Sequence, residues 1–311
     1  MEHYLEQFKT YMQEQDYAKN TVNSYCASVH TFLKWHQQTN GEVGLQKISG
    51  MDIREYREYL GRVKRAKAKT INFKLSSLQC FFGWAANQAI VDENPVAHVK
   101  QIKETDPGPR YLTKAQQKSL LRAIDTDLQL AEMRYSKRKI TRMRDACMMR
   151  FLLNTGLRVN ELTSLDLADI TLTERKGQVL VRNGKGNKQR IVPLNKPARE
   201  AIQDWLAVRP EGEGDALWVT VEYQRSKPLG SRSVQYLVKR LGEAAGIPEL
   251  TPHVLRHSFA KNLVDKQQNM AAVAELLGHA NLNTTRFYVL PNLQDLEKSV
   301  DELEEEFDQD L

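Results

Sequence analysis

The sequence is poor in cysteine, with three among 311 residues. Cys26, Cys80 and Cys147 are odd in number, lie far apart, and each falls within an apolar helical pattern. Paired, closely spaced cysteines of a disulfide framework are therefore lacking. The pattern predicts buried, reduced thiols, which suggests a cytoplasmic protein.

Long hydrophobic runs are also lacking. No stretch of about 18 apolar residues occurs, so no membrane-spanning helix is expected. Residues 1–17 are polar and amphipathic, without the apolar segment of a signal peptide, so we do not expect secretion. With 41% hydrophobic and 27% charged residues, the chain can build a core and stay soluble, and its length suggests about two domains.

Negative charge is concentrated at the end of the chain. The whole chain carries +6, but residues 295–311 hold nine Asp or Glu and one Lys, a local charge of −8. The first 294 residues therefore carry +14. A basic body with an acidic tail is typical of a protein that binds a polyanion, although many basic proteins bind no nucleic acid.

The first hundred residues predict a compact helical bundle. Apolar residues recur at helical spacing over 3–14, 20–38, 51–63 and 67–89, and Asn20 or Thr21 can cap the second helix. A basic cluster lies between the last two helices. It can be a solvated turn or a set of phosphate contacts, and its members are Lys64, Arg65, Lys67, Lys69 and Lys74.

A proline-rich segment without periodicity follows the bundle. We therefore predict a helical domain over 1–103, a linker over 104–111, a second domain over 112–291 and an acidic helix over 292–311. The second domain should be mostly helical, with Thr113 capping its first helix. Its one clear β-hairpin pairs Val179–Val181 with Arg190–Leu194 around a Gly-Lys-Gly turn. The fold class is thus mainly α with a small antiparallel sheet.

A second basic stretch lies early in this domain, in "RYSKRKITRMR". We expect it to contact a nucleic-acid backbone through Arg134, Lys137, Arg138, Lys139, Arg142 and Arg144.

Four further stretches carry residues capable of chemistry. "TGLRVNEL" places Arg158 and Glu161 on one helical face, and "GKGNKQR" places Lys185 at a hairpin tip. "HVLRH" and "LLGHANLNTTRFY" supply His253, Arg256, His279 and Tyr288.

Each of these residues taken alone is more often structural, as an ion pair, a surface lysine or a core tyrosine. His253 and His257 are spaced like metal ligands, but the glutamate of the H-E-x-x-H motif is absent and Arg256 would sit beside the cation. We therefore expect no metal.

Together the residues suit attack on a phosphate. Cationic side chains can neutralise the charge that grows on the phosphate oxygens, and arginine can donate to two of these oxygens at once. A tyrosine, with a reference pKa of about 10, can act as the nucleophile if a proton acceptor or a cationic field lies nearby. With these cations on the protein, neither a metal nor a cofactor is required.

In their order along the chain, these motifs resemble the tyrosine recombinase family, which includes the phage integrases and the Xer-type enzymes. "AKNTVNSY" and "DENP" also resemble the family's amino-terminal, SAM-like core-binding domain, so the resemblance covers nearly the whole chain. It implies that Tyr288 attacks a DNA phosphate and forms a 3′-phosphotyrosyl link. It also implies six catalytic residues: Arg158, Lys185, His253, Arg256, His279 and Tyr288.

The resemblance further assigns roles to several of these residues. Arg158 and Arg256 would stabilise the transition state, Lys185 would protonate the leaving oxygen, and Glu161 would orient the site. His253 would assist proton transfer and His279 would bind the phosphate. The expected partners are double-stranded DNA and three further copies of the chain, with accessory proteins unknown.

The biological role has several alternatives. The basic stretch over 134–144 is longer than expected for a Xer-type enzyme, which favours integration, excision or resolution of a mobile element over dimer resolution. A type IB topoisomerase or a DNA-binding regulator without catalysis are the other possibilities.

The acidic tail predicts an amphipathic helix. Its apolar stripe can pack on its own domain or on a neighbouring subunit, and we favour the neighbour. The stripe consists of Leu293, Leu296, Val300, Leu303 and Phe307.

Overall fold

The computed structural model describes residues 2–104, 108–134, 138–182, 189–210, 214–221, 227–266 and 269–278. The chain divides into two compact units, Met1–Pro107 and Gly108–Leu311. Four residues singled out from the sequence lie outside the described residues, namely Lys137, Lys185, His279 and Tyr288, as does the acidic tail.

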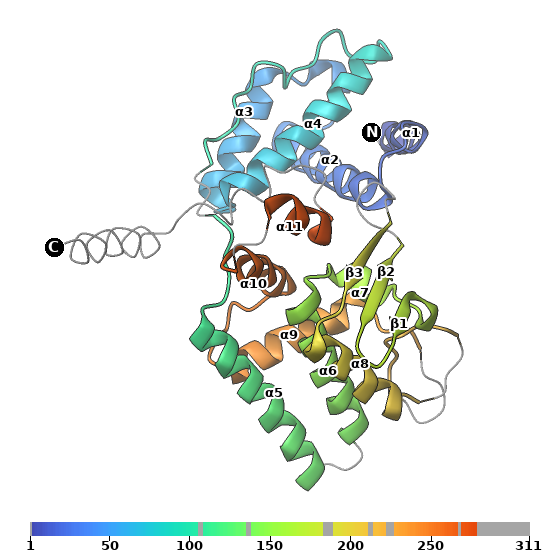
Figure 1. Cartoon of the computed structure of the whole chain (residues 1–311). Helices are drawn as coiled ribbons and strands as arrows, with labels where there is room; N and C mark the ends of the chain where they lie inside the picture. Colours follow the sequence, from blue (N-terminus) through green and yellow to red (C-terminus); the bar gives the residue numbers. More distant parts are fainter. Residues whose placement is uncertain are drawn as a thin grey trace, which may run out of the picture. The chain divides into compact units, whose positions relative to one another are not determined.

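The first unit is a bundle of helices, as its hydrophobic periodicity predicts (Figure 1). Its elements are α1 (Glu2–Glu14), α2 (Lys19–Asn40), the short η1 (Leu45–Lys47), α3 (Gly50–Glu58), the π-helical η2 (Tyr59–Val63) and α4 (Ala68–Asn87). The capping prediction for α2 is wrong. Its N-cap is Ala18, which supplies no side-chain hydrogen bond, so Asn20 and Thr21 lie inside the first turn.

Aromatic side chains fill the core of this unit. Phe8 packs edge-on against Phe81, with ring centroids 5.2 Å apart, and Phe32 packs edge-on against Tyr56 at 5.1 Å. All four rings are fully buried, so they lie at the centre of this core.

The second unit is built around a buried helix. Its helices are α5 (Lys114–Arg134), α6 (Lys139–Thr155), α7 (Val159–Thr163), η4 (Leu167–Asp169), α8 (Lys196–Val208), α9 (Ser231–Ala244), α10 (Pro252–Val264) and α11 (Met270–Leu277). Nearly every side chain of α6 from Arg144 to Leu152 is buried, because α5, α8 and α10 all pack against this helix. Thr113 caps α5 as predicted, since its hydroxyl accepts a hydrogen bond from the Gln116 amide at 3.2 Å.

The sheet of this unit has three antiparallel strands in the order β1–β2–β3, next to α8 in Figure 1. They are β1 (Ile170–Leu172), β2 (Gly177–Val181) and β3 (Arg190–Pro193). The predicted hairpin is confirmed, with Val181 opposite Arg190 and Gln178 opposite Pro193. β1 is not predicted from the sequence, because a three-residue strand is too short to show alternation.

The cysteines are less uniform than predicted. Cys147 is fully buried, and burial raises the pKa of its thiol to about 12, so this thiol is unreactive at neutral pH. Cys26 and Cys80 are only half-buried, so the prediction of burial is wrong for these two. No helix among the described residues is long and apolar enough to span a bilayer.

Candidate active site

The ends of two helices, α6 and α11, define the site. Each helix is followed by a glycine in the left-handed conformation, Gly156 at φ 61° and Gly278 at φ 63°. This conformation is accessible to glycine without steric cost, and it ends a helix with its last carbonyl groups pointing out of the helix. These carbonyl groups need hydrogen-bond donors from elsewhere in the domain.

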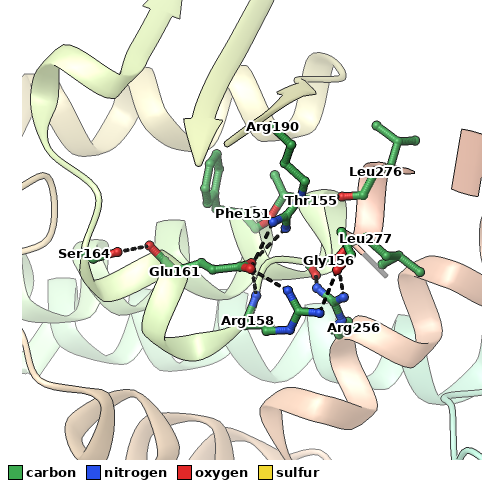
Figure 2. A network of polar contacts seen from close by, with 11 residues as sticks. Phe151, Thr155, Gly156, Arg158, Glu161, Ser164, Arg190, Arg256, Leu276 and Leu277 are labelled. Carbon is green, nitrogen blue, oxygen red and sulfur yellow. Dashed lines mark hydrogen bonds and ion pairs between the residues drawn. The ribbon is translucent and has the colours of Figure 1, made fainter. Parts of the chain in front are cut away.

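Arg256 of α10 joins the two helix ends. Its Nη1 donates to the Gly156 carbonyl at 2.7 Å, and its Nη2 donates to the Leu277 carbonyl (Figure 2). The residue is buried, so both of these bonds form away from bulk water. Arg256 is thereby held where α6, α10 and α11 meet.

Arg158 binds the next carbonyl along the chain. It is the N-cap residue of α7, and its Nη2 donates to the Gly278 carbonyl at 3.1 Å. Its Nη1 lies 2.6 Å from Glu161 Oε1, so the predicted pairing of these two residues is confirmed. The side chain as a whole keeps 27% of its surface exposed, so Arg158 is partly accessible from solvent.

Glu161 is the central anion of the site, at 3% side-chain exposure. Its Oε2 accepts the backbone N–H of Arg158 at 2.8 Å, which caps the start of α7. A second arginine, Arg190 at the start of β3, donates from Nη1 and Nη2 to the two oxygens of Glu161 at 2.9 and 2.8 Å. Figure 2 shows Glu161 between Arg158 and Arg190.

The ionisation of Glu161 follows from these contacts. Burial alone would raise the pKa of this carboxyl group, but the hydrogen bonds from Arg190 and Arg158, with the positive charge of Arg190, outweigh burial and lower the pKa to about 2. Glu161 is therefore a carboxylate at every physiological pH, and it fixes both guanidinium groups.

The two histidines of α10 are shifted the other way. Burial, followed by the charges of Arg256 and Arg158, lowers the pKa of His253. Burial, followed by His253 and Arg256, lowers the pKa of His257 to about 4. Both imidazoles are neutral at pH 7, and a neutral imidazole can accept a proton.

The described part of the site is cationic. Arg158 and Arg190 share one carboxylate, while α10 adds the third guanidinium group, that of Arg256, and two neutral histidines. Such an arrangement can bind an anion and stabilise charge that develops on it. No group of three His, Cys, Asp or Glu side chains that could hold a metal ion occurs in the described part of the chain.

Family comparisons match both units of the chain. Residues 110–294 match the model of the phage integrase family, and residues 4–92 match the model of the phage integrase N-terminal SAM-like domain. The chain belongs to the phage integrase family of tyrosine recombinases. Residues 158–161 and 253–256, predicted from the sequence to carry the chemistry, lie within the first match.

Curated relatives are similar to this recombinase over most of its length. Tyrosine recombinase XerA of Thermococcus kodakarensis is 31% identical over 295 residues, which cover 95% of this chain and 93% of the relative. Tyrosine recombinase XerC of Actinobacillus pleuropneumoniae is 35% identical over 237 residues, 75% of this chain and 72% of the relative. The recombinase is therefore an enzyme of the class that these names describe.

Solved structures share the fold. The XerH site-specific recombinase in a pre-cleavage complex with its difH substrate has a TM-score of 0.69 and 26% identity, over 90% of this chain and 78% of that chain. The Tn1549 transposon integrase in complex with circular intermediate DNA has a TM-score of 0.70 at 20% identity, over 96% and 98% of the two chains. The second likeness shows the fold alone.

The basic cluster of the first unit lies on the surface. Lys64, Arg65 and Lys67 are exposed between η2 and α4, and Lys69 is exposed in the first turn of α4, whereas Lys74 is half-buried and burial lowers its pKa. Arg65 adopts a left-handed backbone conformation at φ 49°. Four cations of the recombinase are thus exposed to solvent, and their role as phosphate contacts stays a prediction.

The second basic stretch divides between surface and interior. Arg134, Arg138 and Lys139 are exposed. Arg144 is buried, however, and its guanidinium group donates to Asp145 at 2.6 Å and to the Val219 carbonyl at 3.0 Å. We therefore withdraw Arg144 from the expected phosphate contacts, because its donors bind groups inside the domain.

Arg142 is also engaged within the domain. It lies 3.7 Å from both Asp127 and Asp145, and Arg240 of α9 donates to Asp127 at 2.8 Å. A network of ion pairs thus joins α5, α6 and α9. The length of the basic stretch has a structural explanation here, so it argues less strongly against a Xer-type role than the sequence suggests.

Arg190 is a site residue that is not predicted from the sequence. The sequence shows it only as the first residue of a predicted strand, 29 positions from Glu161. Its place directly after the "GKGNKQ" turn is the one signal that could have suggested a role, because the turn's Lys185 is a candidate catalytic residue.

Proposed function

We propose that this recombinase cuts and rejoins DNA through a covalent bond between Tyr288 and a 3′ phosphate. The observation that carries the proposal is the convergence of Arg158 and Arg256 on the consecutive carbonyls of Gly278 and Leu277. Two guanidinium groups held this close together, one partly exposed, form a receptor for a phosphodiester. Tyr288 follows ten residues later in the chain.

The chemistry is two successive transesterifications. The Tyr288 phenol oxygen attacks the phosphorus, the bond from phosphorus to the 5′ oxygen breaks, and the 5′ oxygen leaves as a hydroxyl group. A 5′ hydroxyl from a partner duplex then attacks the phosphotyrosine, and the tyrosine is released. One ester bond is exchanged for another in each step, so neither ATP nor water is consumed.

Proton transfer falls to two residues in this proposal. Lys185 gives a proton to the leaving 5′ oxygen, and His253, neutral at pH 7, accepts the proton of the attacking phenol. His279 donates a hydrogen bond to the phosphate. Arg158 and Arg256 supply the positive charge that a metal ion would supply in other phosphotransfer enzymes, so the reaction needs no cofactor.

We further propose that four copies act on two paired duplexes, each copy contributing one tyrosine. The acidic segment over 292–311 would dock on a neighbouring copy through its apolar stripe, and its negative charge would keep it off DNA. Deleting residues 292–311 should leave DNA binding by single copies unchanged and abolish the tetramer in light scattering. A normal tetramer after the deletion would disprove the docking.

For the biological role, we propose integration, excision or resolution of a mobile element. Dimer resolution is the second candidate, and it is favoured by the Xer-type names of the 31% and 35% identical relatives. Plasmids bearing candidate sites in direct repeat test both. Sites recovered from the ends of a mobile element support the first role, and sites in the chromosome away from any such element support the second.

A trapping experiment tests the chemistry. DNA sites can be selected from a random-sequence duplex pool with the purified chain and then nicked just 3′ of each candidate phosphate, so that the short fragment with the freed 5′ hydroxyl diffuses away after cleavage. The parent chain should form a covalent adduct that survives denaturing gels, and Tyr288→Phe should form none. Equal trapping by the two proteins would remove Tyr288 from its role.

Two outcomes would favour the rival functions. Relaxation of supercoiled plasmid by a single copy without a paired site would indicate a type IB topoisomerase. Tight, specific binding of the selected duplex with no adduct from the parent chain would indicate a regulator that only binds DNA.

A further inference from the structure

We propose that Arg190 is a positioning residue of the recombinase, which fixes Arg158 and the end of α11 relative to each other through Glu161. The inference rests on the proposed function and adds a residue to its machinery. Arg190 touches neither the tyrosine nor the phosphate in this scheme, and it acts through the groups that it holds.

The contacts of Arg190 account for this role. Its Nε donates to the Leu276 carbonyl at 2.9 Å, while Nη1 and Nη2 donate to the two oxygens of Glu161. Its side chain is only 8% exposed. One rigid, planar group therefore connects the strand that leaves the Lys185 turn, the carboxylate beside Arg158 and the helix that leads to His279.

The end of α11 shows why this connection matters. Three consecutive carbonyl groups, the last two of α11 and that of its C-cap glycine, each accept from a different arginine: Leu276 from Arg190, Leu277 from Arg256 and Gly278 from Arg158. The first of these arginines is buried and tied to Glu161, whereas Arg158 is partly exposed. A phosphate can therefore bind Arg158 while Arg190 stays bonded to the end of α11.

Gly278 shows how closely Arg190 approaches this helix end. A Cβ atom at position 278 would lie 2.9 Å from Nη1 of Arg190 and 3.1 Å from its Cζ. A side chain there would push the guanidinium group off Glu161. The glycine thus allows both the left-handed turn and the close packing of the arginine.

The control residue is Arg209, which has a similar bonding pattern outside the site. Its Nε, Nη1 and Nη2 donate to the carbonyls of Leu217, Pro210 and Ala216 in the same domain. Arg209→Met therefore removes an arginine held by three nitrogens without touching Glu161 or α11. It measures the effect of removing a merely structural arginine.

The experiment compares Arg190→Met, Arg190→Lys and Arg209→Met on the nicked duplex used for trapping. We expect Arg190→Met to bind this DNA within about twofold of the parent and to form the adduct about a hundredfold more slowly, the scale of a small misplacement of reacting groups. Arg190→Lys keeps the positive charge but loses the paired nitrogens that bind both oxygens of Glu161. Its rate of adduct formation should therefore lie between those of the parent and of Arg190→Met. Arg209→Met should cleave like the parent once its folded fraction is taken into account.

A pH profile separates positioning from general stability. The charges acting on Glu161 come from Arg190 of β3 and from Arg158. Helix α10 brings Arg256 and the neutral His253 close to Arg158. The charged residue of α11, Glu275, is exposed. Without Arg190, burial raises the pKa of Glu161, so the carboxylate that holds Arg158 is lost at a higher pH. The adduct rate of Arg190→Met should fall with acid at a pH where the parent and Arg209→Met keep theirs.

The outcomes distinguish this inference from the proposed function. If the parent forms no adduct, or Tyr288→Phe forms as much, the proposed function itself is wrong. Suppose that the parent traps DNA through Tyr288, and that Arg190→Met has the same adduct rate as Arg209→Met and loses it at the same acidic pH. Then only the positioning role is wrong. If Arg190→Met does not fold, Arg190→Lys decides: a parental rate overturns the role, and a slower rate with unchanged DNA binding supports it.

Discussion

Gly156 has two functions at the end of α6. Its left-handed conformation ends the helix, and its carbonyl accepts Nη1 of Arg256. The residue is also tightly packed, because a Cβ atom at this position would lie 2.4 Å from Cδ1 of Phe259. A side chain here would strain the backbone and push α10, which carries Arg256, away from α6.

We therefore expect Gly156→Ala to destabilise the domain by about 2–5 kcal/mol, the sum of the left-handed penalty for alanine and of overpacking. Gly246→Ala is the matched control. Gly246 is also left-handed, at φ 73°, but a Cβ atom there meets nothing within 4 Å, so stability should fall by only about 1–2 kcal/mol. Urea midpoints at constant slope measure both changes. Equal losses would show that Phe259 moves aside freely.

At the residue scale, the sequence predicts the local pairs and misses the distant ones. Arg158 and Glu161 are three residues apart at the start of a helix, so their pairing follows from helix geometry. Arg190 reaches the same carboxylate from a strand whose position depends on packing. The prediction that Arg144 contacts phosphate is wrong for a similar reason. Nothing in the basic sequence around it shows that its guanidinium group will bind Asp145 and the Val219 carbonyl.

At the scale of elements, a buried serine of α10 binds the segment that precedes α5. The Ser258 hydroxyl donates to the Val254 carbonyl at 2.7 Å and accepts from the Leu112 amide at 2.8 Å. The segment before α5 is thereby fixed against the helix that carries His253 and Arg256.

Replacing Ser258 by alanine leaves the buried Leu112 amide without its acceptor, which should cost about 1–3 kcal/mol. Hydrogen exchange at Leu112 should accelerate accordingly. Ser77→Ala is the matched control, because Ser77 is equally buried and donates to the Phe73 carbonyl four residues back, at 2.9 Å. Its hydroxyl accepts no amide among the described residues, so a smaller loss is expected. Unchanged exchange at Leu112 would contradict the role of Ser258.

The sequence predicts long helices better than short elements. α4 and α9 have enough turns for their apolar stripes to stand out, and the β2–β3 hairpin is indicated in the sequence by Gly-Lys-Gly between two alternating segments. β1 has three residues, and its pairing of Ile170 with Val179 is set by the chain around it. The helix after Gly156, α7, ends at Thr163 after little more than one turn, too short for a helical stripe to show.

At the scale of the whole molecule, the dominant property is the charge of the body. The first 294 residues carry +14, yet many cations of the second unit are paired within it, including those around Asp127 and Asp145. In the first unit, Lys67 and Lys69 are exposed at the start of α4. Exposed cations release the counterions of DNA phosphates when they bind, and paired cations contribute less.

We therefore expect the double variant Lys67→Ala/Lys69→Ala to weaken binding of the selected duplex and to reduce the slope of log affinity against log salt by about 1.8, or about 0.9 for each phosphate that is no longer neutralised. The control Lys196→Ala/Lys239→Ala removes the same net charge from two helices of the second unit. Each of these lysines lies beside a glutamate four residues on, at 3.7 Å from Glu200 and 3.8 Å from Glu243. The slope for this control variant should stay within experimental error of that for the parent. Titrations by fluorescence anisotropy between low and physiological salt measure both slopes. If the two double variants lowered the slope equally, net charge alone would govern binding and the start of α4 would not touch the phosphates.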